Sequence, residues 1–479
     1  MRNSLFAGIM KAEITIGGKT HEELLCGILC LLMLLGCASA EGYWYAAKGD
    51  NGLWGHIDEM GNWVIPPKFD DASDFRGNYA WIQQGDREGF ANRDGEIVLL
   101  LDEDVEADSG YDGFYYGGRE TGIWLLYKEA TGKNSLGTEW LEGFFDVQSG
   151  VYSGLKWRGV NHRESNSRLI AVADETGKWG YVSRDTGEMV IPAKYDSDNM
   201  GSNYSDNMGS NFYDGYAVVT FWNDDYNIVQ TLLLDETGKE YPLPEGINAA
   251  SCDTVISGGL FEVVDKNGLY GYCNTSGEVV IEPQFAYTFE FEDGYAEVEL
   301  TDGTCGVIDR TGNVVMRTTD SLYADVRQGC YVLPTGEHSF TMYSVAGEEL
   351  FTLQGENIVR LWTPEENGLC MYVVEKGRQR RCGWVNMQGK IISEAKWTFP
   401  EYDQPDVYFP SGLQAVYDID GTRLAGYLDE SGELAIPLQF SFVTQFYGEL
   451  AYVGMVQDDG TTQYGYINQQ GEWVYSWTE

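Results

Sequence analysis

Residues 179–195 read WGYVSRDTGEMVIPAKY, and this stretch decides the fold because it recurs along the chain. It begins with an aromatic–glycine–aromatic triplet, turns at a Thr-Gly pair, and continues as Val-Ile-Pro followed by Lys and an aromatic ring. Residues 215–218, GYAV, complete the unit. Apolar residues on either side of a glycine turn predict two short strands joined by a hairpin.

Close copies of this unit begin at residues 54, 270 and 426, a looser copy at residue 382, and half-copies at residues 89, 305 and 464. The rings that open the closest copies are Trp54, Trp179 and Tyr270. The glycine after the first ring is the most regular position, and it is found at Gly55, Gly180, Gly271, Gly306, Gly383, Gly426 and Gly465. Aligned glycines lie about 34–43 residues apart, which leaves room for about eleven units.

Each part of the unit has a physical role. The segment 174–178 recurs as 235–239, 309–313 and 429–433, and it predicts a turn that Asp caps and in which Gly adopts the left-handed conformation. The glycine after the first ring is expected to let a neighbouring backbone approach closely, while the ring fills the space between layers. The proline after Val-Ile is expected to end its strand.

This ordered pattern resembles the tryptophan–glycine (WG) repeat family of bacterial proteins, and the resemblance covers most of residues 43–475. It implies a β-rich repeat protein, often exported, with a binding or scaffold role and no assigned reaction. The first ring is replaced at Tyr270, Cys305, Cys382, Ala425 and Tyr464, which implies irregular packing between some units.

A lone hairpin is marginal in water, so the units must stack. We therefore expect an all-β protein of tandem repeats arranged as propeller blades. Closed propellers usually have about four to eight blades, so about eleven units favour two lobes, 41–241 and 247–479, separated by the Pro-rich segment 241–246. The alternative is an open β-solenoid.

The apolar stretch 24–40, LLCGILCLLMLLGCASA, predicts a secretory leader over residues 1–40. Ala38-Ser39-Ala40 fits signal-peptidase cleavage, whereas Leu34-Leu35-Gly36-Cys37 resembles a bacterial lipobox, which makes Cys37 a candidate for lipidation. A short uncleaved membrane anchor is the third interpretation. All three place the rest of the chain outside the cytoplasm, and the membrane is contacted only through the leader or a lipid on Cys37.

The chain has 75 acidic and 31 basic residues, and its net charge is −44. Such a charge keeps an exported protein soluble and repels other acidic polymers. Nucleic-acid binding is not expected, because it requires a basic face.

Residues with catalytic or metal-binding chemistry are sparse. After the leader, the histidines are only His56, His162 and His338, and the common catalytic motifs are absent. Six cysteines follow residue 250 without a CxxC pair, so they permit disulfides or buried thiols. We expect no catalytic, cofactor-binding or metal-binding residues and no cofactor. Paired carboxylates for glycoside hydrolysis remain open, since no motif selects a pair.

Two functions are consistent with this sequence. The first is an exported or cell-surface module that binds a protein or a glycan without catalysis. The second is a glycoside-acting hydrolase on a propeller-like scaffold.

Overall fold

The computed structural model describes residues 42–108, 122–129, 140–161, 167–196, 210–222, 228–250, 255–319, 326–377, 379–398, 410–418 and 421–479. Residues 44–479 form one compact unit. In the described part of this unit, the chain forms eleven antiparallel sheets of three or four strands, and these residues contain no α-helix. The predicted leader and Cys37 lie outside the described residues.

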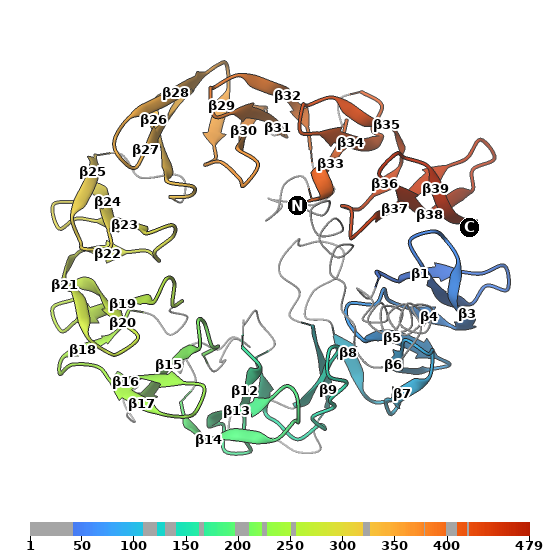
Figure 1. Ribbon diagram of the computed structural model, residues 1–479, viewed down its shortest axis with the longest axis horizontal. Helices are drawn as coiled ribbons and strands as arrows, with labels where there is room; N and C mark the ends of the chain where they lie inside the picture. Colours follow the sequence, from blue (N-terminus) through green and yellow to red (C-terminus); the bar gives the residue numbers. More distant parts are fainter. Residues whose placement is uncertain are drawn as a thin grey trace, which may run out of the picture. The chain divides into compact units, whose positions relative to one another are not determined.

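The eleven sheets follow one another in chain order around a ring, each forming one blade (Figure 1). The prediction of an all-β propeller is confirmed, and the closed ring makes the solenoid alternative unnecessary. The ring contains more blades than the usual four to eight. The boundary predicted between the lobes 41–241 and 247–479 falls between blade 5 and blade 6, and the division into two lobes stays a prediction.

The first five blades contain 17 strands. Blade 1 has β1 (Tyr45–Lys48), β2 (Trp54–Ile57) and β3 (Trp63–Phe69); blade 2 has β4 (Asp71–Ala72), β5 (Tyr79–Gln84), β6 (Arg87–Asn92) and β7 (Ile97–Leu100); blade 3 has β8 (Glu106–Asp108), β9 (Ile123–Glu129) and β10 (Trp140–Asp146); blade 4 has β11 (Gly159–Val160), β12 (Leu169–Ala173), β13 (Trp179–Ser183) and β14 (Met189–Tyr195); blade 5 has β15 (Tyr216–Trp222), β16 (Ile228–Asp235) and β17 (Glu240–Pro242).

The other six blades are built in the same way. Blade 6 has β18 (Ile247–Ala249), β19 (Leu260–Asp265), β20 (Tyr270–Asn274) and β21 (Val279–Phe285); blade 7 has β22 (Tyr287–Thr288), β23 (Tyr295–Glu299), β24 (Cys305–Asp309) and β25 (Val314–Thr318); blade 8 has β26 (Cys330–Gly336), β27 (Ser339–Ser344) and β28 (Glu349–Gln354); blade 9 has β29 (Ile358–Leu361), β30 (Leu369–Lys376), β31 (Gln379–Asn386) and β32 (Ile391–Trp397); blade 10 has β33 (Leu413–Tyr417), β34 (Ala425–Asp429) and β35 (Leu434–Phe440); blade 11 has β36 (Phe442–Val443), β37 (Leu450–Val456), β38 (Thr462–Asn468) and β39 (Trp473–Thr478).

The predicted Asp–Gly turns join consecutive strands of one blade: the turn at Asp174 joins β12 and β13, and the turns at Asp235, Asp309 and Asp429 join the last two strands of their blades. In blade 4, the Asp174 carboxylate accepts hydrogen bonds from the backbone N–H groups of Thr176 (2.8 Å) and Lys178 (3.1 Å). Gly177 has φ +80°, a conformation that side chains resist. The same Asp-capped geometry recurs at Asp235, Asp309 and Asp429, which confirms the predicted turn.

In blades 1, 4, 6, 9 and 10, the glycine after the first ring lies opposite a β-bulge in the last strand. On β13 and β14, Trp179 pairs with Tyr195 and Tyr181 pairs with Ile191, so Gly180 faces the extra residues 192–194. A Cβ atom on Gly180 would lie 2.6 Å from the Ile191 carbonyl oxygen. The corresponding carbonyl is also within 3 Å of such a Cβ at Gly55, Gly271, Gly306, Gly383, Gly426 and Gly465. Close backbone approach is therefore the reason for glycine here.

The prediction that proline ends its strand is wrong. β14 continues through Pro192 to Tyr195, and β35 continues through Pro437 to Phe440. These last strands are edge strands of their sheets, and the proline occupies the bulge. A residue without a backbone N–H costs little there, because no ladder hydrogen bond is lost.

The second ring of each triplet connects one blade to the next. Tyr181, Tyr272 and Tyr427 are fully buried. Their hydroxyls donate hydrogen bonds across the junction to the backbone carbonyls of Ser210 (2.8 Å), Phe289 (2.7 Å) and Thr444 (2.7 Å). Tyr181 and Tyr272 also pack edge-on against Phe212 and Phe291 of the following blade, and Tyr427 packs against Phe446 with the rings tilted.

The same kinds of contact close the ring between blade 11 and blade 1. The Tyr466 hydroxyl donates to the Ala46 carbonyl (2.9 Å), and the Tyr45 hydroxyl donates to the Tyr447 carbonyl (2.9 Å). Trp54 packs edge-on against Trp477, with ring centroids 5.4 Å apart. The two ends of the described chain are thus held together by side chains, without exchange of a strand between the blades.

The first rings of the repeats differ in burial. Trp179 is only 4% exposed and belongs to the core between blades 4 and 5. Trp54 and Tyr270 are half-buried. The expectation that this ring fills interior space therefore holds fully for Trp179 and partly for the other two.

We expect Trp179→Ala to lower the free energy of unfolding by about 3–5 kcal/mol, because it removes a large buried side chain. Trp54→Ala is the matched comparison, and it should cost about 1–3 kcal/mol because Trp54 is half-buried. Urea unfolding of the full chain, followed by circular dichroism, measures both. Equal losses for the two variants, or none for Trp179→Ala, would contradict this assignment of the core.

Candidate functional site

The predicted repeat residues form packing contacts rather than a reactive site. The aligned glycines, from Gly55 to Gly465, lie on the next-to-last strands of different blades, and the three first rings lie in three separate blades. The structure therefore distributes these residues around the ring, and it does not bring them together at one place (Figure 1).

His56 occupies the position of the second ring in blade 1. It is fully buried, its Nε2 atom lies 2.9 Å from the Ser73 carbonyl, and its ring packs edge-on against Phe75. Burial lowers the pKa of His56 to about 4, so the ring is neutral near pH 7. His56 thus connects two blades as the tyrosines do. His338 Nδ1 lies 3.1 Å from the Ile358 carbonyl oxygen. His162 is outside the described residues.

The described cysteines are not paired. Cys273, Cys305, Cys330, Cys370 and Cys382 are free thiols, and all but Cys305 are buried. Burial raises the pKa of Cys273, Cys370 and Cys382 to about 12. A thiol of that pKa is not a nucleophile near neutral pH. For these five residues the structure agrees with buried or half-buried thiols; Cys252 lies outside the described residues.

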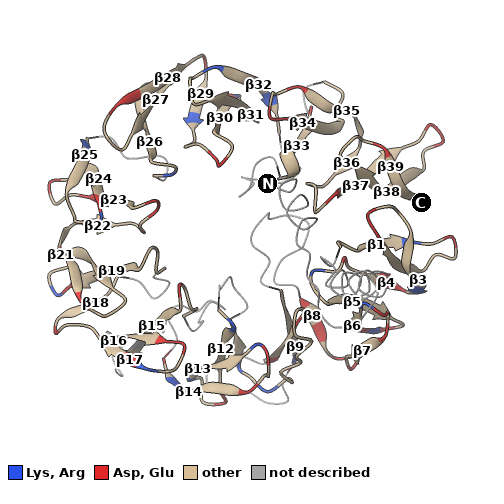
Figure 2. Cartoon of the chain, in the orientation of Figure 1, with Lys and Arg blue, Asp and Glu red and all other residues tan. Residues whose placement is uncertain are grey.

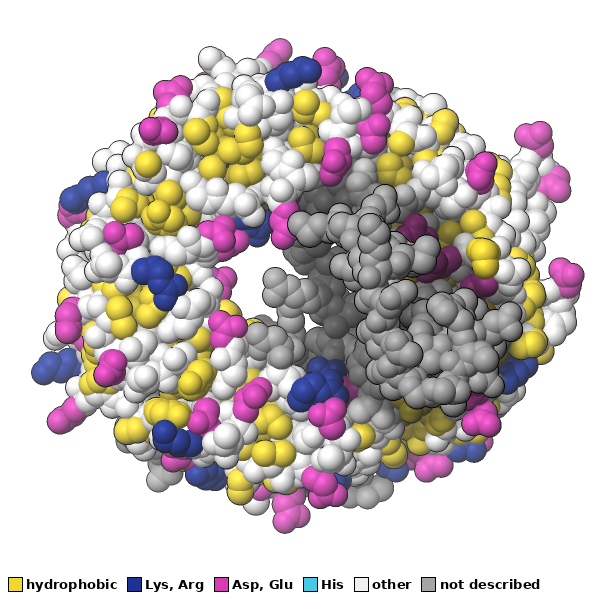
Figure 3. Space-filling view, viewed as in Figure 1, with side chains coloured by type: hydrophobic (Ala, Val, Ile, Leu, Met, Phe, Trp, Pro, Cys, Tyr) yellow, Lys and Arg dark blue, Asp and Glu magenta, His cyan; other side chains and the backbone are white. Residues whose placement is uncertain are grey.

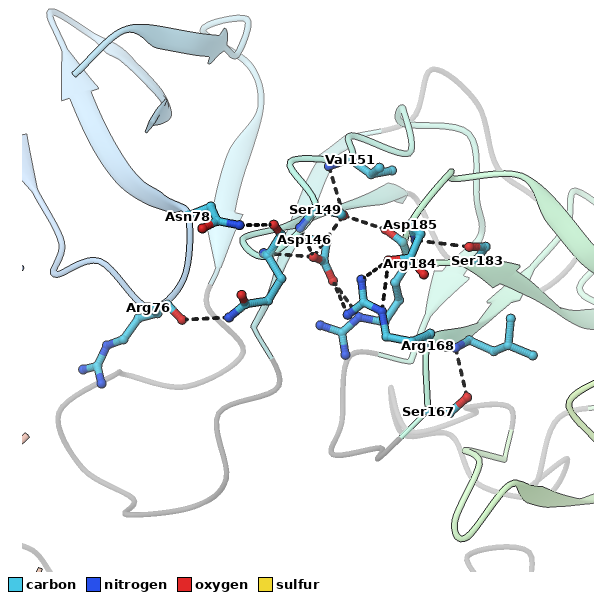
Figure 4. Close-up of polar contacts among 12 residues, drawn as sticks. Arg76, Asn78, Asp146, Ser149, Val151, Ser167, Arg168, Ser183, Arg184 and Asp185 are labelled. Atoms are coloured by element: carbon cyan, nitrogen blue, oxygen red, sulfur yellow. Dashed lines mark hydrogen bonds and ion pairs between the residues drawn. The ribbon is translucent and has the colours of Figure 1, made fainter. Parts of the chain in front are cut away.

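One polar network, centred on the buried Asp146 carboxylate, links three consecutive blades (Figure 4). Asp146, at the end of β10, is fully buried, and its carboxylate accepts a hydrogen bond from Arg184 Nε of blade 4 (2.6 Å). Arg168 Nη1 lies 3.5 Å from the same carboxylate. On the other side, Asn78 of blade 2 donates to the Gln148 carbonyl (2.6 Å).

This network replaces the repeat contacts in blade 3, where the sequence shows no close copy of the unit. A buried carboxylate needs both charge neutralisation and hydrogen-bond donors. Two guanidinium groups supply the charge, and the backbone N–H groups of Gln148 (2.9 Å) and Ser149 (2.8 Å) supply donors. Asp146 is therefore structural. Asp146 was not identified from the sequence, because its partners Arg168 and Arg184 lie 22 and 38 positions further along the chain.

Two partly buried carboxyl groups have strongly raised pKa values. Burial raises the pKa of Glu142 to about 7, although its Oε2 atom accepts a hydrogen bond from the Val160 N–H (2.7 Å). Burial also raises the pKa of Glu262 to about 7, and the negative charge of Glu290 adds to the rise. Carboxyl groups that titrate near neutral pH are candidates for acid–base chemistry.

The Glu262 position distinguishes the junction of blades 6 and 7 from the others. Glu262 pairs with Tyr272 in the ladder, as Ala46 pairs with His56 and Ala415 pairs with Tyr427. Ala171 likewise pairs with Tyr181, so a carboxyl group stands where three other blades have a methyl group.

Two buried oxygen atoms at Glu262 and Thr288 lack hydrogen-bond partners among the described residues. They are Glu262 Oε1 and Thr288 Oγ1. The Thr288 hydroxyl lies close enough to Glu262 to oppose the rise in its pKa, although the two atoms do not meet hydrogen-bond geometry. Glu262 and Glu290 are thus two carboxyl groups whose charges interact, and no motif in the sequence singles them out.

The surface is predominantly acidic, with Asp and Glu spread around the whole ring (Figure 2). Figure 3 shows an opening in the middle of the ring, with acidic side chains on its rim at the left of the view. An open pocket of about 380 Å³ lies at the closing junction, between Glu59 and Met60 of blade 1 and Glu449, Leu450 and residues 468–470 of blade 11.

Within the described residues, no group of three or more His, Cys, Asp or Glu side chains is placed to hold a metal ion. In the same part of the chain, no helix has the length and apolar character needed to cross a membrane.

A family model described as "WG containing repeat" matches residues 54–87, 179–221, 270–304 and 426–455. The chain therefore contains WG repeats at four places, and these are the four close copies recognised in the sequence. No curated protein matches the sequence significantly.

Several solved structures are similar in fold at low identity. A eukaryotic initiation factor is 10% identical with a TM-score of 0.35, covering 74% of this chain and 95% of its own. BamB from Moraxella catarrhalis is 12% identical with a TM-score of 0.28, covering 72% and 92%. The computationally designed Ika8 protein is 12% identical with a TM-score of 0.32, covering 72% and 93%. With TM-scores below 0.5, these likenesses carry no argument about function.

The raised pKa of Glu262 predicts a pH-dependent stability. Its pKa in the folded state, about 7, exceeds the value near 4.3 of an unfolded chain. Between these two pH values, the folded state keeps the Glu262 proton that the unfolded state has lost. The protonated carboxyl group therefore stabilises the folded state most at low pH, and this stabilisation is lost as pH rises through 7. Glu262→Gln should raise the free energy of unfolding by about 1–3 kcal/mol at pH 8 and have little effect at pH 4.

Urea unfolding at the two pH values measures this difference. The exposed Glu245→Gln is the matched control, and its effect should be small at both pH values. A destabilised Glu262→Gln variant at pH 8 would show that the ionised carboxylate is the favoured form.

Proposed function

We propose that this WG-repeat propeller is an exported or cell-surface protein that binds a protein or a glycan and performs no catalysis. The observation that supports this most directly is that the buried polar and thiol side chains serve the packing of the blades. The buried side chains that could take part in catalysis are used otherwise. His56 and Asp146 form contacts between blades, and burial keeps the Cys273 thiol protonated. What the ring offers to other molecules is its surface.

The surface has features that suit binding. The turns and edge strands repeat around a ring of eleven sheets, which offers similar contacts many times over. A net charge of −44 favours encounter with basic partners and disfavours nucleic acids and anionic membranes. Export is supported by the apolar stretch 24–40 and the Gly-Cys pair at Cys37.

A glycoside-acting hydrolase is the second candidate, and Glu262 with Glu290 is the observation that favours it. Glycosidases use one carboxyl group that stays protonated near neutral pH and a second that is ionised. Glu262, with a pKa of about 7, would serve as the acid, and the exposed Glu290 as the nucleophile or base.

The binding proposal is tested with a combined protein and glycan array probed with the full exported chain. We expect saturable binding to a protein or glycan class, and no hydrolysis across a panel of chromogenic glycosides. Hydrolysis that is lost in Glu262→Gln and in Glu290→Gln, with unfolding curves still cooperative, would replace the binding proposal with the enzymatic one.

Processing of the leader is tested separately. If Cys37 is acylated, metabolic labelling with palmitate should mark the chain, globomycin should block its maturation, and Cys37→Ser should abolish the label. Unlabelled parent protein beginning at Glu41 would show cleavage after Ala40 instead.

A further inference from the structure

A separate bulge, which lies nearer the turn than the bulge that contains the proline, places an aliphatic residue at the same position of the last strand in nine blades. On β7, Ile97 pairs with Ala91 and Leu99 with Phe90, so Val98 has no opposite residue on β6. The same shift leaves Val190 without an opposite residue on β13. The bulge residues are Val64, Val98, Val190, Val280, Val315, Leu350, Ile392, Ala435 and Val474. We call these nine residues the bulge belt.

Much of the bulge belt is exposed to solvent. Val98, Val190 and Val280 are 46%, 45% and 43% exposed, and Val315 and Leu350 are each 36% exposed. The residue just before the bulge is often exposed as well, as Ile97, Met189, Val314 and Ile391 show. Because a bulge interrupts the alternation of a strand, two consecutive side chains can face outward. The face of the ring in Figure 3 shows hydrophobic side chains at several places around it.

Folding alone does not require aliphatic residues at these exposed positions. Threonine has a similar β-strand preference and would expose less apolar surface. Repeated exposed aliphatic residues on an otherwise charged surface mark an interaction site. The belt runs through equivalent positions of one ring, so it would offer many weak contacts to an extended partner.

Acidic residues accompany the belt. A glutamate lies two positions before the bulge residue in six blades, and all six are exposed: Glu96, Glu188, Glu278, Glu348, Glu433 and Glu472. In three of these blades, an asparagine of the turn donates a hydrogen bond to the glutamate, as Asn274 Nδ2 does to Glu278 Oε2 (3.0 Å). Each such blade therefore presents a carboxylate beside one or two aliphatic side chains.

We propose that the bulge belt is a docking surface for a basic polypeptide in which Lys or Arg alternates with aliphatic residues. Charge complementarity selects this occupant: the cationic groups meet the glutamates, and the apolar side chains cover the bulge residues. A second copy of this chain and an anionic membrane are disfavoured, because the same glutamates and the charge of −44 repel both. This inference rests on the binding function proposed above and names the class of partner.

The test uses fluorescence anisotropy with the full chain and a labelled 16-residue peptide of alternating Lys and Val. Parallel peptides alternate Lys with Ser and Glu with Val. The variant combines Val98→Thr, Val190→Thr and Val280→Thr, and Val456→Thr is the matched control because Val456 is 58% exposed but outside the belt. A second variant combines Glu96→Gln, Glu188→Gln and Glu278→Gln.

We expect the Lys–Val peptide to bind the parent and the Val456→Thr control alike, and the triple valine variant about tenfold more weakly. The triple glutamine variant should also bind more weakly, with a smaller salt dependence. The Lys–Ser peptide should not distinguish the valine variant from the parent, and the Glu–Val peptide should not bind. Unchanged thermal unfolding of the variants shows that they remain folded.

Equal binding of the Lys–Val peptide to the parent and the triple valine variant would overturn the belt as its site, as would an equal loss in Val456→Thr. A ligand from the array that binds the parent and this variant equally would also overturn the belt, while the proposed binding function would stand.

Discussion

A buried ring that reaches into the following blade is the interaction on which the junctions of the WG repeats depend. In the WG repeats, the ring after the glycine lies in the core of one blade, and its polar atom bonds to a backbone carbonyl of the next, as Tyr181 does with Ser210. The interaction needs both parts, because a buried hydroxyl without a partner would be costly. The bond also satisfies a carbonyl on the entering segment of the following blade. Each junction thus combines apolar burial with a fixed register between neighbours.

The glycines serve this junction from both sides. The glycine beside the ring lets the last strand bulge toward it, which brings its carbonyl within 3 Å of where a Cβ would be. The turn glycine of the next blade then contacts this last strand, as Gly312 does with Ile281 and Gly471 with Ile436. A side chain at either glycine would separate the layers. This explains why the glycine is the more regular residue of the repeat and the tryptophan the more variable one. Ala425 and Cys382 replace the tryptophan in two repeats, and both are buried.

The repeat unit, its turns and the approximate number of blades could be predicted from the sequence because they depend on contacts within about 40 residues. The proline in the last strand was misread because its tolerance depends on the edge position of that strand, which only the assembled sheet reveals. The carboxylate pair of Glu262 and Glu290 was likewise hidden. The pKa of Glu262 is raised because its carboxyl group is buried at a junction, at a position where other blades have alanine. Neither its burial nor its position opposite Tyr272 can be recognised from the sequence.

Ring closure follows from the same nearest-neighbour logic. A stack of equivalent units gains one more junction when its ends meet, and the closing junction here uses contacts of the internal kind. Tyr466 bonds to Ala46 as Tyr181 bonds to Ser210, and Gly61 contacts Val474 as Gly471 contacts Ile436. No blade needs strands from both ends of the chain, since blade 1 and blade 11 each come from a continuous segment. The number of blades is therefore set by how many copies the chain carries and by the angle of each junction, and eleven is as admissible as the smaller numbers that are more common.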